Sequence, residues 1–97
     1  MLVQQLKEAN INALRNHDTT ARSILSVILN KVKLAEIDRR AEGKELVDAD
    51  VVAILQKTVK ELTEEREAFA KANRDETVAT LTQQIEFVSS FLPKMMS

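Results

Sequence analysis

Apolar residues recur at alternating steps of three and four along most of the chain, the spacing that places side chains on one face of an α-helix. This pattern predicts four helices, over residues 2–15, 19–41, 49–71 and 76–91. Stripes with this alternation pack with shallow crossings between neighbouring helices. We therefore predict an all-α fold, a small bundle of four mostly antiparallel helices in a single domain over residues 1–97.

Short polar segments separate the predicted helices, and each of them ends on an aspartate. A carboxylate accepts hydrogen bonds from the free N–H groups of a helix start, so we expect Asp18, Asp48 and Asp75 to cap the helices that follow. Gly43, the only glycine, suits the left-handed position that ends residues 19–41. Pro93 disfavours helical geometry at the preceding residue and is expected to end the last helix.

The predicted helix 19–41 carries apolar residues on two sides. Its main stripe lies on one side and consists of Ala21, Leu25, Ile28, Val32 and Ala35. Val27 and Leu34 lie seven residues apart on the opposite side. Such a helix is either central in its bundle or covered by a partner. We favour the central position. In the alternative, Val27 and Leu34, or Phe87 and Phe91 of the last helix, form a partner surface.

The composition limits the kinds of functional site that this chain can form. The 97 residues include no cysteine, one histidine and one glycine, which excludes disulfides, thiolate sites and glycine-rich phosphate loops. His17 has no nucleophile at a recognisable spacing, and we interpret it as a solvated turn residue. The acidic run at residues 61–67 is interpreted as a solvated helix face with i,i+4 ion pairs. We predict no catalytic residue, no cofactor and no metal ligand.

The sequence does not indicate a membrane protein. Its longest apolar run is far shorter than the ~20 residues that span a bilayer. The first ten residues lack the basic and apolar regions of a secretory signal. We therefore expect a cytoplasmic protein.

Basic residues give the only candidate binding surface for nucleic acid. Arg22, Lys33 and Arg40 are 11 and 7 residues apart, so they share one face of the predicted helix, and Arg15 precedes them. A line of cations can follow a phosphate backbone. Glu36 lies on the same face and is expected to neutralise much of the positive field. An ordinary mixed-charge surface is the alternative, because the net charge is only −1.

Two further arginines interrupt the apolar stripes. Arg39 and Arg66 stand where the heptad pattern expects apolar residues. We expect their stems to lie on apolar surface and their heads to reach water or an acid such as Glu86. A phosphate or partner contact is the alternative for both.

Several segments, in this order, resemble the YqeY family, also called the GatB-tail family. They are Asp18 with Arg22, Glu36 to Arg40, Glu45 to Asp48, Val51 to Lys57, Phe69 to Asp75, Ile85-Glu86 and Phe91-Leu92-Pro93. The resemblance covers roughly Leu6 to Lys94. Members of this family generally continue past Leu-Pro into a smaller helical subdomain. We therefore expect residues 1–97 to correspond to the family's N-terminal helical domain without that subdomain.

The resemblance implies a link to tRNA-dependent amidotransferases, in which a similar tail follows the catalytic part of the B subunit and helps to hold tRNA. Free-standing members are described as carbon–nitrogen ligases with glutamine as amido donor. We predict a non-catalytic accessory module that associates with tRNA or an amidotransferase-type complex. The alternative is a helical interaction module, with a homodimer among its possible assemblies. An independent amidotransferase is the third hypothesis.

Overall fold

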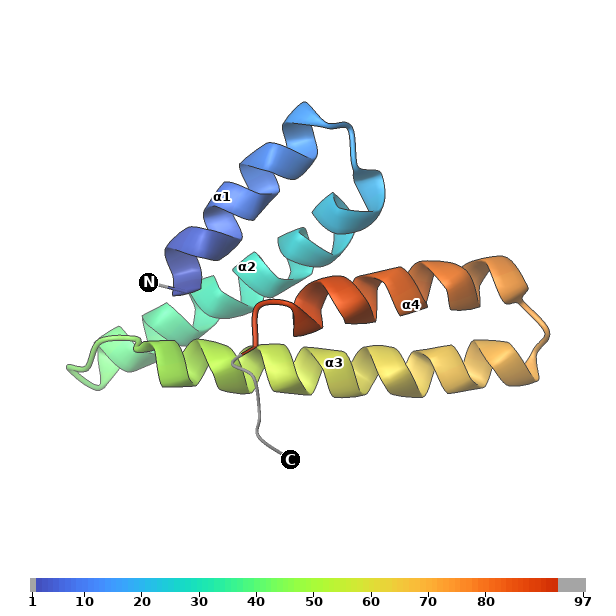
Figure 1. The fold of residues 1–97 in the computed structure, drawn as a ribbon. Helices are drawn as coiled ribbons and strands as arrows, with labels where there is room; N and C mark the ends of the chain where they lie inside the picture. Colours follow the sequence, from blue (N-terminus) through green and yellow to red (C-terminus); the bar gives the residue numbers. More distant parts are fainter. Residues whose placement is uncertain (1, 93–97) are drawn as a thin grey trace. The chain divides into compact units, whose positions relative to one another are not determined.

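The computed structural model describes residues 2–92, which form four α-helices and no strand. These are α1 (Leu2–Arg15), α2 (Thr19–Ala41), α3 (Asp48–Lys71) and α4 (Asp75–Ser89), shown in Figure 1. The predicted all-α class, a small helical bundle, is confirmed. The last two helices each begin one residue earlier than predicted, and α4 ends at residue 89 rather than 91. Pro93 lies outside the described residues.

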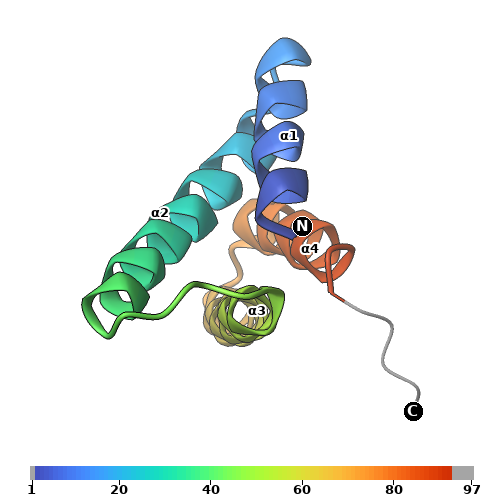
Figure 2. The ribbon, with the colours of Figure 1, turned by 90° about the vertical axis from the view of Figure 1, so that its left-hand side faces the viewer.

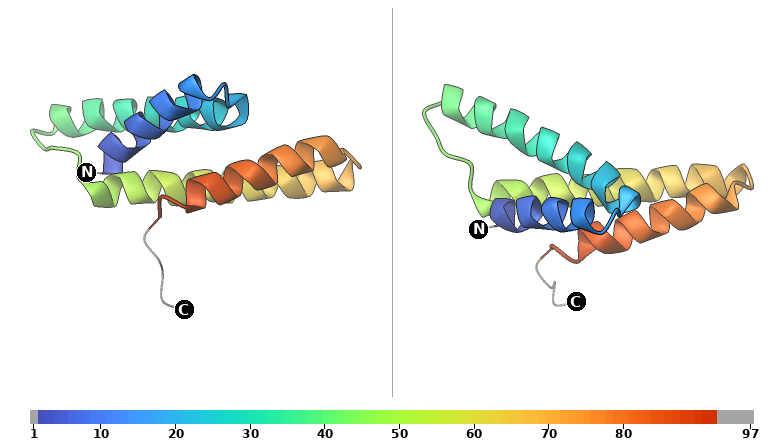
Figure 3. Two further views of the ribbon diagram at one scale, coloured as in Figure 1. Left: turned by 45° about the horizontal axis from the view of Figure 1, so that its top comes forward. Right: turned by 90° about the horizontal axis from the view of Figure 1, so that it is seen from above.

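The chain divides into two compact units, Met1–Ile54 and Leu55–Ser97. The first unit contains α1, α2 and the first two turns of α3, and the second contains the rest of α3 and α4. In the first unit, α1 and α2 form a V-shaped hairpin (Figure 2). In the second, α3 and α4 lie side by side and antiparallel (Figure 3). The single domain over residues 1–97 stays a prediction.

The core of the first unit follows the apolar stripes that the sequence predicts. Leu6 of α1 and Leu25 and Ile28 of α2 are fully buried, and Val32 is nearly so. The start of α1 is fixed by a polar contact, because the Leu2 N–H donates to Asp48 Oδ1 at 3.2 Å. Burial of these side chains supplies most of the favourable free energy of such a pair, since short helices are marginal alone.

The second unit buries two polar residues that the stripe pattern does not include. Leu62, Leu81 and Val88 are buried at helical spacing, and Thr58 and Gln84 are buried as well. Both polar side chains have interactions, as buried polar groups require. The apolar pattern could not predict their burial, because it counts only apolar residues and so does not include a threonine or a glutamine on the same helix face.

The first three helices end in the same way. His17, Gly43 and Asn73 have φ angles of 55°, 75° and 59°, in the left-handed region. At each end, the N–H groups of this left-handed residue and of the residue after it donate to carbonyls of the last helical turn. After α2, Gly43 N donates to Arg40 O and Lys44 N to Arg39 O. This is the Schellman arrangement, which satisfies the free carbonyls of a helix end. The predicted role of Gly43 is confirmed.

The predicted caps at the helix starts are only partly right. Asp18 caps α2, and its Oδ1 accepts from the Ala21 N–H at 3.1 Å. The prediction is wrong for Asp48 and Asp75, which lie inside the first turns of their helices. For α3 the carboxylate of Asp50 instead accepts from the Val47 N–H at 3.2 Å. This is one half of a capping box, in which the third helical residue reaches back to the cap.

Candidate functional site

The predicted basic residues of α2 lie on an exposed edge of that helix. Arg22, Lys33 and Arg40 are all exposed, and we call them the basic edge. The edge runs along roughly 27 Å at 1.5 Å per residue, within about 20° of one line along the helix. Arg15 is also exposed, at the last position of α1. No contact joins Arg15 to the basic edge within residues 2–92.

The cations of the basic edge are not paired with acids. None of Arg15, Arg22, Lys33 and Arg40 takes part in an ion pair within residues 2–92. Glu36, which was expected to neutralise the edge, is half-buried and lines a pocket together with Arg40, without an ion pair to it. The basic edge therefore presents its charges to solvent without a direct acidic partner.

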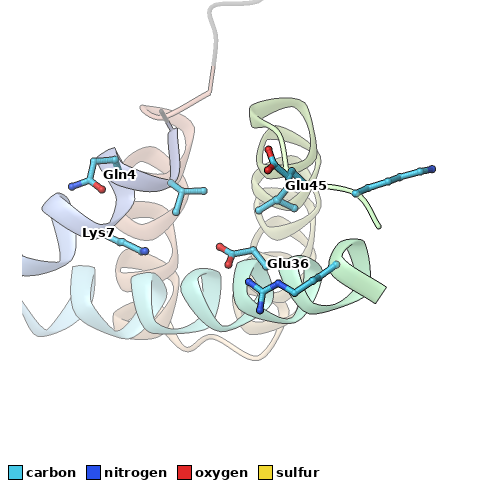
Figure 4. A pocket seen from close by; sticks show the side chains of 8 residues that line it. Gln4, Lys7, Glu36 and Glu45 are labelled. Carbon is cyan, nitrogen blue, oxygen red and sulfur yellow. The ribbon is translucent and has the colours of Figure 1, made fainter. Parts of the chain in front are cut away.

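A pocket of about 510 Å³ lies where α1, α2 and the segment after α2 approach one another. It is lined by Val3, Gln4, Lys7, Glu36, Arg40, Lys44, Glu45 and Leu46. Figure 4 shows Lys7 of α1 and Glu36 of α2 reaching toward each other across it. The lining carries three basic and two acidic side chains. The lining holds no serine, histidine or other nucleophile–base pair.

Sequence reasoning identified only Arg40 as a functional candidate among the side chains lining this pocket. Lys7, Lys44 and Glu45 come from α1 and from the segment between α2 and α3, and they show no shared periodicity in the sequence. They line one pocket because the fold brings α1, α2 and the segment after α2 to the same hollow. No local pattern could have indicated this grouping.

Arg39 has a structural role. Its Nη2 donates to Asp50 Oδ1 at 2.6 Å, and its Nη1 lies 3.8 Å from Glu42 Oε2. A second hollow, of about 420 Å³, surrounds this pair. Arg39 therefore ties the end of α2 to the start of α3. This contact takes the place of the phosphate contact that was the alternative for Arg39.

The pKa of Asp50 lies below its ordinary value of 3.8, because the Val47 N–H and then the Arg39 guanidinium favour the charged carboxylate. The unfolded chain therefore binds a proton more readily than the folded one. The stability from this carboxylate is present above pH 3.8 and is lost as the pH falls through the lowered pKa. We expect Asp50→Asn to lower the melting temperature at neutral pH and to lose this deficit in acid, as thermal unfolding across the pH range would show.

The matched control for Asp50→Asn is Glu8→Gln, on the exposed surface of α1. Glu8 takes part in no ion pair or side-chain hydrogen bond within residues 2–92, so its amide variant should follow the wild type at every pH. A deficit of Asp50→Asn that stayed constant from neutral to acid pH would contradict the assigned role of the carboxylate.

Arg66 also has a contact inside its own unit. Its Nη1 donates to Thr82 Oγ1 at 3.4 Å, which links α3 to α4. The expected pairing with Glu86 is therefore wrong. Threonine on α4 lies one helical turn before that glutamate, so the arginine reaches the nearer acceptor.

The proposed partner surfaces differ in exposure. Val27 and Leu34 of α2 are 46% and 55% exposed, so the first unit does not cover this side of α2. Phe87 and Phe91, in the second unit, are half-buried. Their rings contact each other edge to face, with centroids 5.2 Å apart. The aromatic pair thus already covers part of its own surface, whereas the apolar face of α2 is open.

Two further observations complete the description of the site. Within residues 2–92, no group of three or more histidine, cysteine, aspartate or glutamate side chains has the arrangement of a metal site. None of the four described helices combines the length and the apolar character that crossing a membrane requires.

A family model described as "Yqey-like protein" matches residues 3–97. No curated protein matches the chain.

Proposed function

The chain belongs to the YqeY-like protein family, and from this premise we propose that it is a non-catalytic accessory module that associates with tRNA in the cytoplasm. The module would resemble the tail of the B subunit of tRNA-dependent amidotransferases. The observation that carries the proposal is the basic edge, with three exposed cations along one helix and no ion pair to any acid among residues 2–92.

The physical basis of such binding is the release of counterions from phosphates. Each neutralised phosphate contributes roughly 0.7–0.9 to the slope of log affinity against log salt concentration. Structured RNA is recognised largely through its phosphates and its shape, so cations along a rigid helix suit it. With few cations and a net charge of −1, the association should be weak and salt-sensitive.

The test is tRNA retention by the purified chain in gel-shift titrations at low and moderate salt. Arg22→Ala combined with Arg40→Ala should weaken binding and reduce the salt slope by about 1.4–1.8, since each lost phosphate contact removes roughly 0.7–0.9. The matched control combines Lys57→Ala with Lys71→Ala, at two exposed lysines of α3. It removes two positive charges, as the double arginine variant does. The proposal fails if the wild type retains no tRNA at low salt, or if both double variants behave alike.

The second candidate is a helical interaction module. It is favoured by the exposed apolar face of α2, where Val27 and Leu34 would lose water-exposed area on binding. If this second candidate is right, the carbon–nitrogen ligase activity described for the family belongs to a complex that contains the module. The module itself does not catalyse the reaction. A glutaminase assay of the purified chain addresses that point, and turnover above background would overturn the non-catalytic proposal.

A further inference from the structure

The exposed face of α2 has a regular heptad pattern. Ser23, Val27, Asn30, Leu34, Ile37 and Ala41 follow one another at steps of 4, 3, 4, 3 and 4, and all six are exposed. We call these six residues the seam. Its three large apolar members are Val27, Leu34 and Ile37, with exposed fractions of 46%, 55% and 52%. The buried face of α2, around Leu25 and Ile28, lies on the opposite side of the helix.

A repeat of 3.5 residues is the spacing of a coiled coil. It keeps a seam facing a partner helix over several turns, whereas a single helix on a globular core needs only a 3.6-residue stripe. In heptad notation Val27, Leu34 and Ala41 occupy a positions, and Ser23, Asn30 and Ile37 occupy d positions. The helix therefore carries two faces, one used inside the first unit and one suited to a second helix.

We propose that the seam binds the seam of a second copy of this chain, in a parallel, in-register two-stranded coiled coil. This inference deepens the second candidate function above, on which it rests; it shares only Lys33 with the basic edge, and its mass measurements are made without tRNA. Two features favour a second copy of this chain as the partner. They are the position of Asn30 in the seam and the charges beside the seam.

Asn30 selects a partner that is identical and parallel. In a parallel in-register pair each residue of the seam lies opposite itself, so one Asn30 side chain meets the other. An amide both donates and accepts hydrogen bonds, so the two can satisfy each other. In the antiparallel arrangement a positions face d positions, which places Asn30 opposite Leu34 and leaves the amide without a partner. A polar residue at an a position is known to specify register, and Asn30, at a d position, would act through the same pairing with its own copy.

The charges beside the seam agree with the same orientation. Lys33 occupies a g position and Asp38 the e position five residues later, and these two positions face each other between parallel strands. Lys33 of one copy thus meets Asp38 of the second copy, and the pair occurs twice by symmetry. Neither residue takes part in an ion pair within residues 2–92. The antiparallel arrangement with the same layers would instead bring Lys33 against Lys33.

The seam spans fewer than three heptads, so the dimer should be weak and should depend on protein concentration. Sedimentation equilibrium on RNA-free protein, from low micromolar to near millimolar concentration, should show the mass rising from 10.9 kDa toward twice that value. Leu34→Glu should weaken the dimer at least about tenfold, because it places a charge in a seam that excludes water. The matched control is Leu14→Glu on α1, at a residue with a similar exposed fraction of 54%.

Charge reversal and cross-linking test the orientation. Lys33→Asp alone should weaken the dimer, and adding Asp38→Lys should restore it. The chain has no cysteine, so Ser23→Cys provides a single reporter. In the parallel dimer this variant should form an intermolecular disulfide under mild oxidation, and Leu34→Glu in the same chain should prevent it.

Three results would overturn the proposal. They are a monomeric mass at the highest concentration with helical circular dichroism intact, a dimer that persists in Leu34→Glu, and a dimer in which Ser23→Cys does not cross-link. None of these results bears on tRNA retention, which is measured through Arg22 and Arg40, outside the seam. Loss of tRNA binding likewise leaves the mass measurements unaffected.

Discussion

Leu25→Ala should lower the free energy of unfolding by about 2–5 kcal/mol, the range for truncating a fully buried leucine and leaving a cavity. Leu25 is 0% exposed and stands in the middle of the buried face of α2. Small domains have only about 5–15 kcal/mol of stability in total, so this one change should remove a large part of it. Urea unfolding followed by circular dichroism measures the effect.

The matched control for Leu25→Ala is Leu14→Ala. It is the same substitution at a residue of α1 that is 54% exposed, and it should change the free energy of unfolding by no more than about 0.5 kcal/mol. Equal effects of the two substitutions would mean that the buried face of α2 has been assigned to the wrong residues. Both leucines lie on helices, so the change in helix propensity from leucine to alanine is the same in both variants. The difference between their free energies of unfolding therefore reports burial.

Gly43→Val should lower the free energy of unfolding by about 1–2 kcal/mol, the cost of a left-handed backbone at a residue with a side chain. Gly43 has φ of 75° and closes the Schellman motif at the end of α2. A Cβ placed there meets nothing within 4 Å, so the cost comes from the backbone and not from a clash. Urea unfolding of the variant beside the wild type measures it.

Two other helix ends of this chain supply the control for Gly43→Val. His17 and Asn73 occupy the equivalent positions with positive φ, and asparagine tolerates this conformation better than most residues. Gly43→Asn should therefore cost clearly less than Gly43→Val. If the two variants were equally stable, the backbone conformation at residue 43 would not be what limits substitution there.

Pattern reasoning worked where the structure depends on neighbours in sequence. The bounds of α1 and α2 match the prediction, and Asp18 and Gly43 act at the helix ends as expected. Caps and stripes are set by residues within one or two turns, so a short window of sequence contains the necessary information. The family, too, is found in the order of short segments, which the match over residues 3–97 confirms.

The same reasoning was weaker for contacts between elements. Asp48 looks like a cap from its neighbours, but its carboxylate accepts from Leu2, 46 residues away. Arg39 looks like a candidate phosphate contact, but Asp50 binds it at 2.6 Å. Whether a charged side chain is free for a ligand depends on which acids the fold brings near it.

By itself, the sequence determined that this chain is helical, where its helices begin and end to within two residues, and which face of α2 is buried, because 3.6-residue periodicity is a local property. Only the tertiary structure decided which charges and apolar residues stay available. Within residues 2–92 it paired Arg39, left the basic edge without an ion pair and brought Lys7 and Glu36 to one pocket, and the first unit left the seam of α2 exposed. These outcomes depend on packing between segments distant in sequence, which no local pattern encodes.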